Sequence, residues 1–86
     1  PKIEAKSHVN YKPYSYYVTR GSRHKRLISP DDADIVALVA NDIKAVMFIP
    51  VKEIKVARVR KKPEDFGDEI FSLNVALEAV KNDRLV

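Results

Sequence analysis

A glutamate and a lysine near the start of the chain, Glu4 and Lys6, have the residue types and spacing best suited to chemistry. The run Ile3-Glu4-Ala5-Lys6 alternates apolar and polar residues, which predicts a strand with one apolar and one polar face. Glu4 and Lys6 then project from the same face. One interpretation is a solvated ion pair, which contributes at most about 1 kcal/mol at a protein surface. The other is a metal-dependent phosphodiester site, in which Glu4 binds Mg²⁺ or Mn²⁺ and Lys6 stabilises developing negative charge.

Basic residues gather in two places along the chain, which has 86 residues and a net charge of +4. The first cluster comprises Lys12, Arg20, Arg23, His24, Lys25 and Arg26, and the second comprises Lys52, Lys55, Arg58, Arg60, Lys61 and Lys62. Such clusters favour a polyanionic partner, and DNA is the partner we expect. A soluble domain with ordinary surface lysines and arginines is the alternative.

Tyrosines accompany the first basic cluster, and aromatic rings beside cations suit stacking on bases. We therefore expect Tyr16 to bind nucleic acid together with the first cluster. On a strand, Tyr14 and Tyr16 face one way and Tyr17 faces the other, so one of these two sides belongs to the core.

Length and composition limit the classes of protein to which the chain can belong. Its length fits a single domain, residues 1–86, or the C-terminal part of a larger one. The absence of cysteine excludes disulfides, thiol catalysis and cysteine-bound zinc. No apolar run reaches the roughly eighteen residues of a spanning helix, and no signal-peptide pattern opens the chain. We expect a cytoplasmic protein with no membrane partner.

The apolar pattern predicts a small mixed α+β sheet with a central hairpin and a C-terminal helix. Two apolar runs, 35–40 and 45–49, are separated by Asn41-Asp42 and form the expected antiparallel hairpin. A strand is expected at 14–20, a single helical turn after Ser29, a short helical turn at 51–54 and a charged edge strand at 55–62. Apolar residues spaced i, i+3, i+4 and i+7 from Leu73 predict the helix, with Ser72 as its cap.

These residues together resemble a family of nucleases. The run Ile3-Glu4-Ala5-Lys6-Ser7 resembles the second half of the PD-(D/E)xK motif. The later runs Asp32-Ala33-Asp34-Ile35-Val36-Ala37-Leu38-Val39 and Val46-Met47-Phe48-Ile49-Pro50-Val51 are similar to the group I intron-associated homing endonucleases of that superfamily. The resemblance extends over roughly residues 2–54.

The resemblance implies the C-terminal half of a restriction-endonuclease-like core. It implies that Glu4 is a metal-binding acid, that Lys6 is the catalytic lysine, and that the backbone carbonyl of Ala5 is a further metal ligand. The second essential acid of the family lies upstream of this strand, and only three residues precede Glu4 here. The chain is therefore expected to be part of a nuclease whose upstream segment lies elsewhere, or to have kept the fold without the chemistry.

Three functions remain open from the sequence. The first is a metal-dependent DNA endonuclease or its C-terminal part, expected as a homo-oligomer because cutting both strands needs two sites. The second is a nucleic-acid-binding module without catalysis, in which Glu4 and Lys6 only pair. The third is a structural or interaction subunit whose basic clusters face an acidic protein.

Overall fold

The computed structural model has seven strands in three small sheets and one C-terminal helix, and it describes residues 1–9, 13–21 and 23–84. The strands are β1 (Ile3–Ser7), β2 (Tyr14–Tyr17), β3 (Thr19–Arg20), β4 (Arg26–Leu27), β5 (Ile35–Ala40), β6 (Ala45–Pro50) and β7 (Arg58–Lys61). The helices are two short 3₁₀ turns, η1 (Val51–Glu53) and η2 (Pro63–Asp65), and α1 (Glu69–Arg84). This architecture confirms the expected small mixed α+β fold.

The largest sheet has the strand order β1-β5-β6, with β1 parallel to β5 and β5 antiparallel to β6. The β5–β6 pair is the predicted hairpin. Its register runs from Ile35 opposite Pro50 to Ala40 opposite Ala45, and residues 41–44 form the turn. Lys44 in this turn has a left-handed φ of 49°. The two apolar runs form strands because β5 is covered on both faces.

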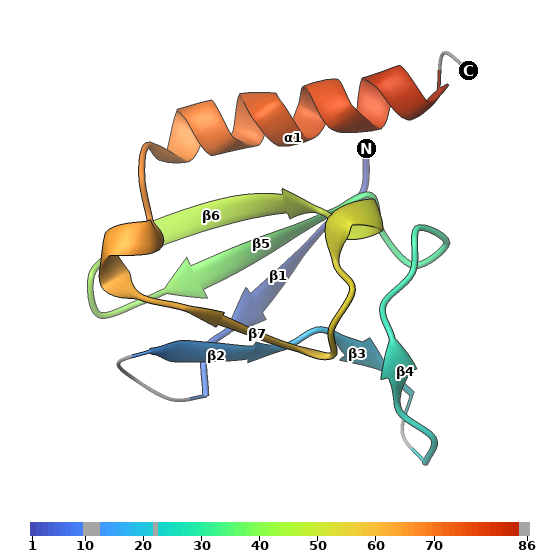
Figure 1. Cartoon of the computed structure of the whole chain (residues 1–86), viewed down its shortest axis with the longest axis horizontal. Helices are drawn as coiled ribbons and strands as arrows, with labels where there is room; N and C mark the ends of the chain where they lie inside the picture. The colour runs from blue at the N-terminus through green and yellow to red at the C-terminus, as the bar shows by residue number, and fades with distance from the viewer. Residues whose placement is uncertain (10–12, 22, 85–86) are drawn as a thin grey trace.

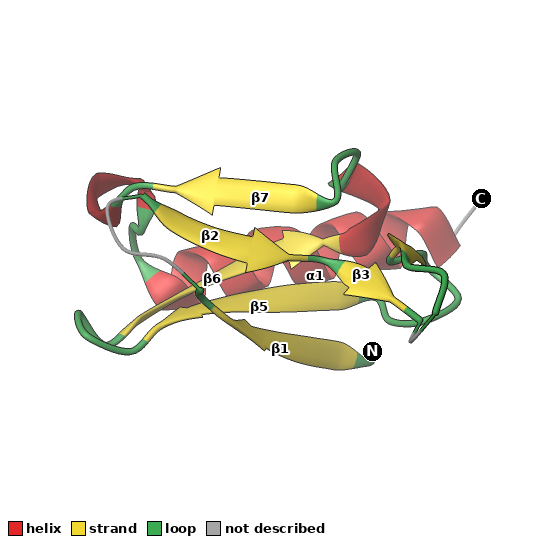
Figure 2. Ribbon diagram, turned by 90° about the horizontal axis from the view of Figure 1, so that it is seen from below, coloured by secondary structure: helices red, strands yellow, loops and turns green. Residues whose placement is uncertain are grey.

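The other two sheets are antiparallel pairs, β2 with β7 and β3 with β4. Figure 1 shows α1 on one side of the β1-β5-β6 sheet, with β2, β7, β3 and β4 on the other side. Seen from below in Figure 2, α1 lies behind the sheet. The chain therefore forms three layers: α1, the central sheet, and the layer that contains the two antiparallel pairs.

The main core fills the space between the central sheet and the β2 layer. It contains Tyr14, Tyr16, Val18, Ile28, Ala33, Val36, Leu38, Ala40, Val51 and Ile54. A second, smaller core lies under α1, where Ala76 and Val80 meet Ile35 and are flanked by Phe48 and Leu77. Val36, Leu38 and Ala40 of β5 thus enter the main core, whereas Ile35 enters the smaller one from the opposite face of the strand.

Helix α1 begins earlier than its apolar spacing predicts. The carboxylate of Asp68 accepts a hydrogen bond from the Phe71 amide at 2.8 Å, as an N-cap does. Ser72, predicted as the cap, lies inside the helix, and its hydroxyl donates to the Glu69 carbonyl. Both residue types cap helices well, and Asp68 occupies the capping position here. In the described part of the chain, no helix is long and apolar enough to cross a membrane.

Candidate active site

Strand β1 turns its polar face inward. Glu4 and Lys6 are 19% and 22% exposed in their side chains, whereas Ile3 is 43% exposed. In the β1–β5 register Glu4 lies beside Val36 and Lys6 beside Leu38, both fully buried in the main core. The apolar face of β1 stays open because α1 packs on β6 and β5, while β1 is at the sheet edge. The burial of the two faces is thus the reverse of the usual arrangement for an amphipathic strand.

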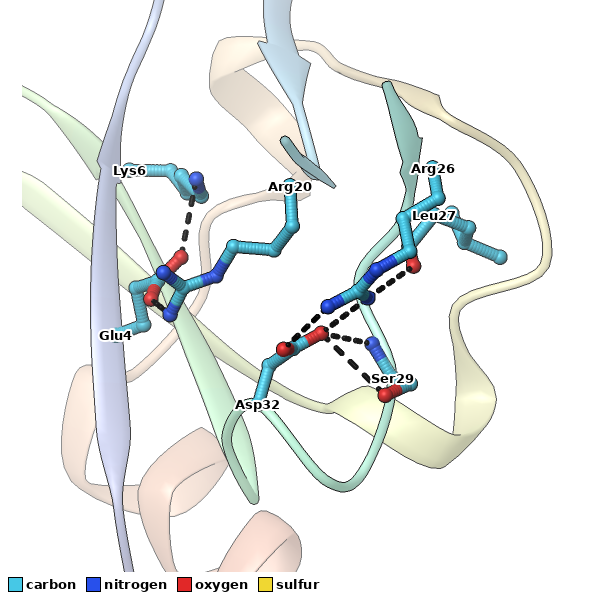
Figure 3. Close-up of polar contacts among 7 residues, drawn as sticks. All are labelled: Glu4, Lys6, Arg20, Arg26, Leu27, Ser29 and Asp32. Carbon is cyan, nitrogen blue, oxygen red and sulfur yellow. Dashed lines mark hydrogen bonds and ion pairs between the residues drawn. The ribbon is translucent and has the colours of Figure 1, made fainter. Parts of the chain in front are cut away.

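The Glu4 carboxylate is held by two cations. The Lys6 ammonium lies 3.0 Å from Oε2, and the Arg20 guanidinium donates to Oε1. Figure 3 shows the three side chains converging from β1 and β3. Arg20 is 36% exposed, and its Nε is buried without a hydrogen-bond partner among the described residues. The sequence pattern predicts the Glu4–Lys6 pair, but Arg20 joins it only through the fold.

A histidine extends the inward face of β1 by one step. His8 is half-buried, and its ring stacks edge-on against Tyr14 with centroids 4.9 Å apart. The Tyr14 hydroxyl in turn donates to the Asp42 carboxylate at 2.8 Å. The inward face of β1 therefore runs from a charged cluster at Glu4 to an aromatic one at His8.

A second ion pair lies near the first, and Figure 3 shows both. The Arg26 guanidinium donates two hydrogen bonds to the Asp32 carboxylate, at 2.7 and 2.9 Å. The Ser29 amide donates to the same carboxylate at 2.9 Å. These bonds, with Arg26 first, hold the pKa of Asp32 well below its usual range. Asp32 thus ties Arg26 on β4 to the single turn predicted after Ser29.

The predicted nucleic-acid-binding cations fall into two groups. Arg20 and Arg26 already pair with carboxylates, whereas Arg23, His24 and Lys25 are exposed between β3 and β4. This connection begins at a glycine with φ +105°, which permits the tight reversal. The three exposed residues are therefore presented at the tip of a short hairpin. Lys12, also predicted to bind nucleic acid, lies outside the described residues.

Tyr16 is buried in the core, which corrects its predicted contact with nucleic acid. Its side chain is fully buried, and its hydroxyl donates to the Val39 carbonyl at 2.9 Å. Burial raises the pKa of Tyr16 to about 12. The exposed tyrosine is Tyr17, at 50%, with the Arg58 guanidinium 5.7 Å from its ring centroid. The alternation of the strand separated these tyrosines, and the side carrying two of them became the core.

The described residues do not fit a complete Mg²⁺ site. No group of three His, Cys, Asp or Glu side chains able to hold an ion occurs in the described part of the chain. Both Glu4 oxygens already face cations, and Asp34 accepts a hydrogen bond from the Lys2 amide at 2.7 Å. Mg²⁺ needs several convergent oxygens, and one carboxylate with the predicted Ala5 carbonyl supplies too few.

Comparisons with protein families, curated proteins and solved structures find no match to this chain. The resemblance to the PD-(D/E)xK endonucleases and the restriction-endonuclease-like core therefore stay predictions from the sequence.

Proposed function

We propose that the chain contributes Glu4 and Lys6 to the phosphodiester-cleaving centre of a DNA endonuclease. The observation that carries this proposal is the burial of the pair on the inward face of β1, with Arg20 beside it. A purely solvated pair would project from the open face of an edge strand. Here the open face carries Ile3 and Ala5 instead.

The chemistry follows from the charges. Cleavage of a phosphodiester builds negative charge on the phosphate oxygens, and fixed cations lower the barrier by stabilising that charge. Lys6 and Arg20 share one carboxylate, so their charged groups are held close together and oriented before the DNA arrives. Glu4 orients both cations, and for it to be also this chain's contribution to metal binding one of its oxygens would have to leave its cation. Further oxygen ligands would have to come from outside the described residues, for example from a second chain, and we assign no step to the metal.

Binding of the DNA backbone is assigned to the exposed hairpin tip, with Arg23, His24 and Lys25. Contacts from such residues to phosphates are independent of sequence and weaken steeply with salt. Arg26 is less available for this contact, because a phosphate would first have to displace the Asp32 carboxylate.

A nucleic-acid-binding module without catalysis is the second candidate. The observation that favours it is the neutralisation of both Glu4 oxygens within the chain, which leaves Glu4 a complete structural role. In this alternative the hairpin tip binds the backbone in the same way, and divalent metal has no effect on binding.

Calorimetric titration of Mn²⁺ into the chain bound to a short DNA duplex tests both functions. The endonuclease proposal expects DNA-dependent metal uptake that Glu4→Gln abolishes and that Glu78→Gln, an exposed helix control, leaves unchanged. DNA binding itself should weaken in an Arg23→Gln/Lys25→Gln variant. Metal uptake unaffected by Glu4→Gln would exclude Glu4 from the metal site. Intact DNA binding with no metal uptake would support the second candidate.

A further inference from the structure

An apolar groove lies on the side of the molecule that holds β6 and α1, away from the hairpin tip. Its volume is about 330 Å³. One wall is β6, from Val46 to Pro50, and the other wall is the beginning of α1, with Phe71 and Val75. The link between η2 and α1 also lines it. Figure 1 shows this link beside the beginning of β6, where α1 also begins.

The helix wall exposes large apolar side chains that the fold itself does not use. Helix α1 buries Ala76 and Val80 against the sheet, whereas Phe71 is 69% exposed and Val75 is 50% exposed. The two residues are four apart, so they lie on one flank of the helix. An exposed apolar patch beside a groove marks an interaction surface rather than an ordinary solvated face.

The charge of the groove is opposite to the charge of the chain. Among the described residues that line it, three are acids, Glu53, Asp65 and Asp68, and none is a lysine or an arginine. None of the three forms an ion pair with another described residue. Asp65 and Asp68 accept backbone hydrogen bonds, which fix their carboxylates without neutralising them. In a chain of net charge +4, a groove lined by three acids without ion-pair partners among the described residues favours a cationic partner.

Two observations narrow the kind of partner. A symmetric contact between two copies would bury both acidic grooves in one interface, and acids close to the symmetry axis would then face the same acids of the other copy. Addition of a strand along the outer edge of β6 is also disfavoured, because the Phe48 amide already donates to the Ser72 hydroxyl at 3.3 Å. Recognition by side chains is the arrangement that remains.

We propose that this groove binds a short basic segment of a partner protein. A bulky apolar side chain of the segment sits between β6 and the Phe71–Val75 flank, and its lysines or arginines pair with Glu53, Asp65 and Asp68. This docking site is separate from the Glu4 site and does not depend on the proposed endonuclease function.

Selection of phage-displayed random linear peptides on the immobilised chain tests the proposal. The peptides retained should combine several lysines or arginines with a leucine or an aromatic residue. The most enriched peptide, made synthetically, should bind at least tenfold more weakly to Phe71→Ser, since an aromatic anchor contributes that much at an interface. Glu53→Lys should weaken binding about fivefold, and raising NaCl from about 0.05 to about 0.5 M should weaken it further.

Matched controls separate the groove from general effects. Ile70→Ser removes an equally exposed apolar residue of α1 outside the groove, and Glu78→Lys reverses an exposed helix charge outside it. Both should bind the peptide like the unaltered chain, and backbone amide spectra should show that every variant is folded. Enriched peptides without net positive charge, or equal binding to Phe71→Ser, would overturn the proposal. So would a dimer in sedimentation that Phe71→Ser dissociates, because a second copy would then be the occupant.

Discussion

Replacing Glu4 by glutamine should destabilise the fold by about 1–2 kcal/mol. Breaking a fully buried ion pair costs about 3–5 kcal/mol, and losing an exposed pair costs about 0–1 kcal/mol. Glu4 is 19% exposed and faces two cations, so its loss leaves Lys6 and Arg20 side by side and only partly hydrated. The expected cost therefore lies between the two limits.

Urea unfolding followed by circular dichroism measures this change in the free energy of unfolding. Glu78→Gln, an exposed change on α1, is the matched control and should be neutral. The double variant Glu4→Gln/Arg20→Gln should recover part of the loss, because it removes one of the uncompensated cations, with a coupling energy of about 1 kcal/mol. Salt should reduce the difference only modestly, since partly buried pairs are screened less than exposed ones.

A small effect of Glu4→Gln on the free energy of unfolding would refute this reasoning. A Glu4→Gln variant within about 0.3 kcal/mol of the unaltered chain would mean that the carboxylate is effectively solvated. The observation that supports the endonuclease proposal over an ordinary surface pair would then be lost. A stabilised variant would also contradict the reasoning, because two cations cannot gain from losing their shared carboxylate.

Three further changes test other parts of the structure. Tyr16→Phe should cost about 1 kcal/mol by removing a buried hydrogen bond. Burial raises the pKa of Tyr16 from 10.0 to about 12. The stability that its neutral hydroxyl contributes is therefore present below pH 10 and is lost as the pH rises toward 12. The variant should show a flatter alkaline unfolding profile by circular dichroism. Asp32→Asn should lower the thermal midpoint near neutral pH. The pKa of Asp32 is lowered chiefly by Arg26, so its contribution is present above the ordinary pKa of 3.8 and lost on acidification, and the variant should lose less stability between about pH 5 and pH 2. Gly21→Ala should destabilise the β3–β4 hairpin by about 1–3 kcal/mol, because φ is +105° and the added Cβ would lie 2.5 Å from a backbone oxygen. Faster hydrogen exchange confined to the hairpin amides would confirm it, and unchanged exchange would contradict it.

Local sequence signals predicted the parts of the fold that local contacts determine. The hairpin followed from two apolar runs with turn residues between them, since neighbouring strands pair through the shortest connection. The single turn after Ser29 followed from a capping residue placed directly before a proline, and the 3₁₀ turn η1 lies within the short helical turn expected at 51–54. The start of α1 was misplaced because Ser72 and Asp68 are both capping residue types, and only the fold shows that Asp68 accepts the capping hydrogen bond.

Which face of a strand is buried depends on partners far away in the sequence. The tyrosine pattern of β2 gave two sides but no means of choosing between them, and the packing of β2 over β5 placed Tyr16 in the core and Tyr17 at the surface. The same limit applies to Arg20. It is sixteen residues from Glu4 and lies on a two-residue strand, so no spacing rule associates the two side chains.

The orientation of β1 supports the proposed function in a way that its residue pattern alone does not. A Glu-x-Lys on an edge strand is uninformative when its polar face meets solvent, because charged residues are usual at sheet edges. In this fold α1 covers β6 and β5 but leaves β1 uncovered, so the open face of β1 holds Ile3 and the charged pair turns toward the β2 layer. Exposing an isoleucine loses hydrophobic stabilisation on one face, and partly burying two ionised groups costs desolvation free energy on the other. Arg20 offsets part of that cost through the shared carboxylate. The cost that is left is the argument for the reacting centre that we propose, because fixed charges in a partly dry setting would stabilise a developing negative charge more strongly than solvated ones.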